Sequence, residues 1–150
     1  MSYPLDVASG FWNKVKQLAD DGKIISIDKV KKEIYEQKDA LQQWCEDNLP
    51  KTFFKETTQI LTEYKQVTGW AISKSNHYLP NALAEFLHAD EADAWLVAYV
   101  LADNSNRIVV TYEKSEPARR NKVKIPDACL ANDIQFYNII DMFRRLGERF

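Results

Sequence analysis

The chain has 150 residues, of which 45% are hydrophobic and 28% are charged, and this profile suits one globular domain over residues 1–150. Its formal net charge of −2 gives no overall attraction to a polyanion, so any nucleic-acid affinity must come from a local basic patch. Cys45 and Cys129 form no Cys/His pattern, which argues against a disulfide framework and a zinc site. No leader sequence and no long apolar run is visible, so we expect a cytoplasmic protein without membrane contact.

The first third of the chain predicts two helices around a strand. Apolar residues recur at helical spacing over 7–18, and the sequence Asp20-Asp21-Gly22 ends that helix. The β-branched run 23–27 predicts a short buried strand. Asp28 then caps a predicted helix over 29–37.

The middle of the chain is predicted to be helical. One helix runs from its cap Asp39 to Pro50, and another covers 57–70. Pro80 begins a short helix, and Asp90 is predicted to cap a strongly apolar helix over 92–101.

The last third returns to alternating strands and helices. Residues 107–111 predict a strand covered on both faces, and a polar loop follows over 114–124. A helix from Pro126 to Ala131, a strand over 134–137 and a closing helix over 139–146 complete the chain.

This order predicts an α/β fold in which helices wrap a parallel sheet. Only three strands are convincing, and the series begins with a helix. A doubly wound domain normally begins with a central strand, so one strand is missing from the pattern.

Three acidic residues are predicted to share one edge of the sheet. Asp93 begins the apolar helix, Glu113 follows the strand ending at Thr111, and Asp127 begins the next helix. Strand carboxyl ends and the helix starts that follow them form the rim where ligands usually bind. Clustered carboxylates favour Mg²⁺ or Mn²⁺, which would assist phosphoryl transfer. The alternative is that these acids are ordinary helix-terminus or solvated residues.

Five basic residues gather in the loop between Glu113 and Asp127, where they could bind RNA phosphates. They are Lys114, Arg119, Arg120, Lys122 and Lys124. A local anion site is the functional interpretation, and a solvated charged loop is the alternative. No aromatic residue is interleaved, so base stacking is not indicated in this loop.

Other chemistries are disfavoured by spacing. His77 and His88 are not placed as metal ligands, and neither cysteine has a neighbouring base in the sequence. The glycines are isolated, so no phosphate-binding glycine loop can form. A flavodoxin-like or receiver-like domain shares the order of elements, but no phosphoacceptor aspartate with a later lysine can be assigned.

Six short blocks stand in an order that resembles a known group. They are Phe11-Trp12, Lys23-Ile24-Ile25-Ser26, Lys32-Glu33-Ile34, Asp93-Ala94-Trp95-Leu96-Val97-Ala98, Val109-Val110-Thr111-Tyr112-Glu113 and Lys122-Val123-Lys124-Ile125-Pro126-Asp127-Ala128-Cys129. Together they resemble an uncharacterised bacterial family of PIN-like proteins, related to VapC-type toxins. The resemblance implies a three-layer fold, a metal-dependent ribonuclease activity on RNA, and an antitoxin partner.

The resemblance also implies which residues form the site. Glu33 matches the acid of the helix after the second strand, and Asp93 matches the acid heading the apolar helix. The later acid is either Glu113 or Asp127, so the implied catalytic set contains all four. The implied metal ligands for Mg²⁺ or Mn²⁺ are Glu33, Asp93 and Asp127.

The chain departs from the family at its start. The family's first strand ends in an aspartate that ligates metal, and the chain has no such segment, so we expect an N-terminal truncation. Unpaired sheet edges attract other strands, so we expect a homodimer or a rearranged segment, and little nuclease activity. The alternative function is a non-catalytic PIN-like module that acts by protein contact.

Overall fold

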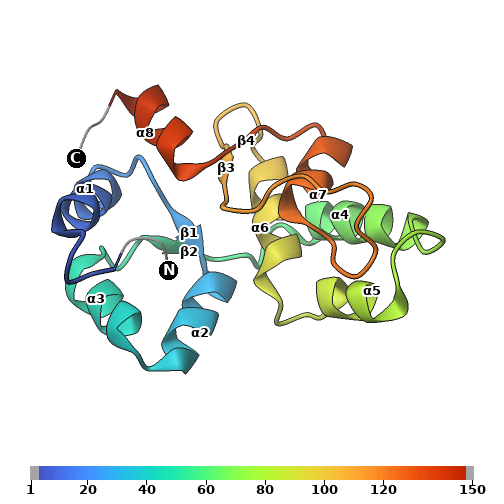
Figure 1. Ribbon diagram of the computed structural model, residues 1–150, viewed down its shortest axis with the longest axis horizontal. Helices are drawn as coiled ribbons and strands as arrows, with labels where there is room; N and C mark the ends of the chain where they lie inside the picture. Colours follow the sequence, from blue (N-terminus) through green and yellow to red (C-terminus); the bar gives the residue numbers. More distant parts are fainter. Residues whose placement is uncertain (1–3, 148–150) are drawn as a thin grey trace. The chain divides into compact units, whose positions relative to one another are not determined.

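The computed structural model describes residues 4–147, which divide into two compact units covering 4–56 and 57–147 (Figure 1). Each unit contains its own two-stranded parallel sheet. That they form one domain stays a prediction.

The N-terminal unit surrounds a short sheet with three helices. Its elements are α1 (Ser9–Asp20), β1 (Ser26–Ile27), α2 (Asp28–Gln37), α3 (Ala40–Asn48) and β2 (Phe54–Lys55). Leu18 and Ile27 are fully buried, and Trp12 meets Trp44 edge-on with ring centroids 4.9 Å apart. The predicted helices of this part are therefore confirmed to within a few residues.

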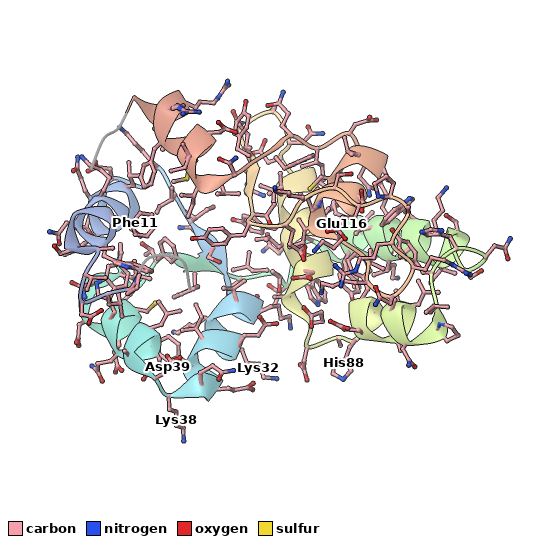
Figure 2. The ribbon with its side chains drawn as sticks, in the orientation of Figure 1. Phe11, Lys32, Lys38, Asp39, His88 and Glu116 are labelled. Carbon is pink, nitrogen blue, oxygen red and sulfur yellow. The ribbon has the colours of Figure 1, made fainter. Side chains whose placement is uncertain are left out.

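The turn between α2 and α3 follows from local chemistry. The predicted cap Asp39 is confirmed, because its carboxylate accepts a 3.1 Å hydrogen bond from the Gln42 N–H. Lys38 precedes it in the left-handed conformation and ends α2, and both residues lie in the turn between α2 and α3 (Figure 2). Asp28 is not the cap that we predicted, because Ile27 takes that position and Asp28 is the first helical residue.

The strand predicted over 23–27 is only two residues long. The N–H groups of Lys23 and Ile24 donate to the Leu18 carbonyl at the end of α1, so they cannot join a ladder. Its partner β2 was not predicted at all. Ser26 pairs with Phe54 and Ile27 with Lys55, in parallel.

The C-terminal unit contains five helices and a second short sheet. Its elements are α4 (Leu61–Ser73), α5 (Pro80–Leu87), α6 (Ala92–Leu101), β3 (Val109–Val110), α7 (Ile125–Ala131), β4 (Phe136–Tyr137) and α8 (Ile139–Leu146). α6 contacts α4, α5, α7 and β3, and its Ala94, Val97 and Ala98 are completely buried. Tyr64 of α4 stacks on Trp95 of α6 at a centroid distance of 3.7 Å. The apolar helix is thus the centre of this unit, as its composition predicts.

Several predicted boundaries in this unit are wrong. α4 begins at Leu61 rather than at residue 57. Glu91, not Asp90, stands at the N-cap of α6, and the Asp90 N–H donates to the His88 ring nitrogen. The last strand begins at Phe136, because the Ile134 N–H donates to Cys129 at the end of α7.

The α/β class with parallel strands is confirmed. Val109 pairs with Phe136 and Val110 with Tyr137 in parallel. The described residues form two separate two-stranded sheets rather than one wrapped sheet. The three-layer PIN arrangement stays a prediction. None of the helices within residues 4–147 is long and apolar enough to cross a membrane.

Candidate functional site

Three of the four predicted site acids belong to the C-terminal unit. Asp93 is in the first turn of α6, Glu113 follows β3, and Asp127 is in the first turn of α7. Glu33 belongs to α2 of the N-terminal unit, where it is exposed.

Lys122 joins acids from two helices. Its ammonium nitrogen lies 3.4 Å from the Glu85 carboxylate of α5 and 3.8 Å from the Asp93 carboxylate of α6. Burial alone would lower the pKa of Lys122, but the negative charges of Asp93, Glu85 and Glu113 outweigh burial and raise it. Asp93 and Glu113 therefore both act on the same ammonium group.

Lys124 forms the second pair of this arrangement. Its nitrogen lies 3.6 Å from one oxygen of Glu113, and the other oxygen accepts a 2.9 Å hydrogen bond from the Ile125 N–H. Val123, between the two lysines, is buried in the core. This alternation is typical of an extended segment, and it directs both lysines towards acids. We call Glu85, Asp93, Glu113, Lys122 and Lys124 the charged cluster.

Asp127 also has a structural role, while its predicted role as a catalytic and metal-binding acid stays a prediction. It is only 8% exposed, and its two oxygens accept from the Ser115 hydroxyl at 2.6 Å and from the Glu116 N–H at 3.1 Å. These bonds fasten the loop after Glu113 to the start of α7. Asp127 is thus an anchor of the loop.

Hydrogen bonds and an ion pair fix the conformation of the basic loop. Arg119 donates to Asn121 at 2.8 Å and pairs with Glu116 at 3.1 Å, and Glu116 is labelled in Figure 2. Arg120 donates to the His77 carbonyl at 2.8 Å, and its own carbonyl accepts from the Leu79 N–H. Both arginines therefore hold the loop in place.

Lys114 differs from the other four predicted RNA-binding residues. Within residues 4–147 its ammonium group forms no ion pair, and its side chain is exposed. It lines a hollow of about 270 Å³ at the carboxyl ends of β3 and β4, two strands that lie side by side in Figure 1. Residues 111–115 form one wall, and residues 136–138 with Asp141 form the other.

Sequence reasoning missed part of this arrangement. It did not select Glu85, Asn138 or Asp141. Asn138 caps α8 by accepting from the Asp141 N–H at 2.8 Å, and an asparagine directly after a strand could have indicated this. Glu85 carries no such signal, because only the fold brings it to Lys122.

The donor type of the charged cluster fits the implied Mg²⁺ or Mn²⁺. Mg²⁺ needs one or two carboxylates, with water and phosphate oxygens as the remaining ligands. Asp93 and Glu113 supply two carboxylates, and each already attracts the ammonium group of a lysine. Among residues 4–147, no three His, Cys, Asp or Glu side chains converge on one metal position.

The fold and the cluster define an α/β protein that gathers acids and lysines beside the carboxyl end of a parallel strand pair. The family model described as "Domain of unknown function (DUF4411)" matches residues 1–150, so the chain belongs to the DUF4411 family. A search of curated proteins and a search of solved structures each found no match.

Proposed function

We propose that the chain is a PIN-like, metal-dependent endoribonuclease whose site is built on Asp93 and Glu113. The observation that supports this most strongly is that two neighbouring lysines each pair with one of these acids, since Lys122 lies 3.8 Å from Asp93 and Lys124 lies 3.6 Å from Glu113. Two acids from separate elements, one heading a helix and one following a strand, therefore lie beside one short basic segment.

Asp93 and Glu113 are the groups that would hold the metal. Mg²⁺ or Mn²⁺ supplies an activated water and neutralises charge that develops on the phosphodiester. The Ile125 N–H orients Glu113, and Asp127 holds the loop that follows it. Lys122 and Lys124 stand beside these acids and would attract the RNA phosphates. Glu33 is assigned to the site by family resemblance alone.

The test is cleavage of single-stranded RNA with Mn²⁺ at enzyme in excess over RNA, so that even the low rate expected of this chain is measured, comparing the wild type with Asp93→Asn. The substitution removes the charge but keeps the shape, so we expect a loss of about 100-fold or more in rate. Asp133→Asn is the matched control, because Asp133 is exposed in the same unit and asparagine tolerates its left-handed backbone. Equal rates for Asp93→Asn and the wild type would remove Asp93 from the site.

The competing function is a PIN-like module that binds a protein such as an antitoxin and needs no metal. A ligand that binds only the folded chain raises its melting temperature. We expect Mn²⁺ at millimolar concentration to raise the wild-type melting temperature and to have less effect on Asp93→Asn. The absence of any shift in the wild type would favour the interaction module.

A further inference from the structure

The hollow at the carboxyl ends of β3 and β4 places aromatic rings beside a lysine. Tyr112 is 60% exposed on one wall, and Phe136 and Tyr137 line the other. Lys114 follows Tyr112 by two residues and also lines the hollow. The basic loop contains no aromatic residue of its own: Tyr112 precedes it, and the pairing of β3 with β4 brings Phe136 and Tyr137 to the hollow.

The charges around the hollow favour an anion. Its two carboxylates are already paired, because Glu113 lies 3.6 Å from Lys124 and Asp141 lies 3.4 Å from Arg144. Lys114 has no ion pair among the described residues, so its charge is in excess there. A phosphate group would be the natural counter-charge.

The polar groups suit the edge of a base. Asn138 uses its side-chain oxygen to accept from the Asp141 N–H, which leaves its NH₂ group as a donor. Thr111 uses its hydroxyl oxygen to accept from the Glu113 N–H at 3.1 Å, which leaves the hydroxyl proton to donate. Asn138 and Thr111, which both line the hollow, therefore each keep a hydrogen-bond donor.

We propose that this hollow binds one nucleotide of single-stranded RNA, with the base stacked on Tyr112 and a phosphate beside Lys114. Small-molecule pockets begin at about 300 Å³, so about 270 Å³ suits a single nucleotide unit with the rest of the strand outside. The strand must be single, because a paired base cannot offer its face to a tyrosine. This inference rests on the proposed function, since it names the substrate subsite next to Glu113.

The test measures binding without cleavage. Binding is measured by fluorescence anisotropy of a labelled single-stranded RNA in EDTA. A length of about eight nucleotides covers the site size of a typical stacking groove. We expect Tyr112→Ala to raise Kd about 5- to 100-fold, while Tyr112→Phe keeps the ring and binds nearly as the wild type does. Leu130→Ala is the control, because Leu130 is 58% exposed in the same unit but outside the hollow.

Lys114 provides an independent measurement. Lys114→Ala should lower the slope of log Kd against log salt concentration by about 0.7, the value for one phosphate contact on a single strand. Failure of the wild type to bind this RNA, or equal binding by Tyr112→Ala, would overturn the subsite.

The subsite and the nuclease proposal can fail separately. Binding through Tyr112 without Mn²⁺-dependent cleavage would keep the subsite and reject the nuclease. Cleavage by Tyr112→Ala with unchanged KM and kcat would keep the nuclease and reject the subsite. Melting temperatures in EDTA show whether each variant is folded. Because Tyr112 is exposed, we expect its replacement to change the melting temperature little.

Discussion

The ammonium nitrogen of Lys122 lies 3.8 Å from the carboxylate of Asp93. The two residues were predicted for different tasks, one to hold RNA phosphate and the other to hold a metal. In the folded chain they neutralise each other, and Glu85 adds a second acid at 3.4 Å from the same nitrogen. The Asp93 and Glu85 carboxylates that attract Lys122 would also attract a divalent cation, so the lysine would compete with the metal for them.

Replacing Lys122 by methionine should therefore tighten metal binding. Two unit charges 4 Å apart interact by about 1 kcal/mol even in water, which corresponds to about a fivefold lower Kd for Mn²⁺ when the competing charge is removed. Electron paramagnetic resonance of free Mn²⁺ measures this directly at low ionic strength. Lys122→Arg keeps the charge and serves as the control. Weaker or unchanged Mn²⁺ binding by Lys122→Met would show that the lysine does not compete.

The same lysine should make stability depend on pH in the alkaline range. Its pKa in the fold is raised above the ordinary value of 10.5, because the charges of Asp93, Glu85 and Glu113 outweigh the effect of its burial. A raised pKa means that the folded chain binds this proton more tightly than the unfolded chain does. The stabilisation is thus complete below about pH 10.5 and is lost as the pH rises through the folded pKa.

Urea unfolding at pH 8 and near pH 11 can separate this effect from other titrations. We expect the difference in unfolding free energy between the wild type and Lys122→Met to shrink at the higher pH. A difference that stays constant or grows across this interval would contradict the ion pairs at Lys122.

Asp127 tests whether an acid of the predicted site acts by metal binding or by holding a loop. Asp127→Ala would leave the Ser115 hydroxyl and the Glu116 N–H without their acceptor, at a cost of about 1–3 kcal/mol in unfolding free energy. Asp127→Asn keeps one acceptor oxygen and should cost less. The measurement is urea unfolding in EDTA, where a metal ligand would contribute nothing. If the unfolding free energies of Asp127→Ala and Asp127→Asn both equal that of the wild type, Asp127 does not act as the loop anchor.

Sequence reasoning succeeded where the signal is local. Helical spacing predicted α1, the closing helix α8 was predicted with its observed bounds, Pro80 begins α5 as expected, and Asp39 caps α3. The structure also places Asp93 at the head of α6 and Glu113 beyond β3, which are the positions that the sequence predicts. Each of these features depends on residues within one or two turns of chain.

Sequence reasoning failed where a partner distant in the chain decides the structure. β2 is two residues long and exists because Phe54 and Lys55 pair with β1, and no periodicity is readable over two residues. The approach of Lys122 to Glu85 spans 37 positions, so no local pattern contains it. Two of the rings in the hollow, Phe136 and Tyr137, were overlooked for the same reason, since they reach residues 109 and 110 through strand pairing.

The two cysteines give a final prediction about the integrity of both units. Burial raises the pKa of the Cys129 thiol to about 12, and burial together with the charge of Asp39 raises the pKa of Cys45 to about 11. Only the thiolate attacks a disulfide reagent, so at pH 8 neither thiol should react readily in the folded chain. Ellman's reagent should release its coloured thiolate slowly in buffer and release two equivalents rapidly in urea. Because Cys45 lies in α3 and Cys129 in α7, rapid reaction of one thiol in buffer, located by mapping the modified peptide, would identify which unit opens.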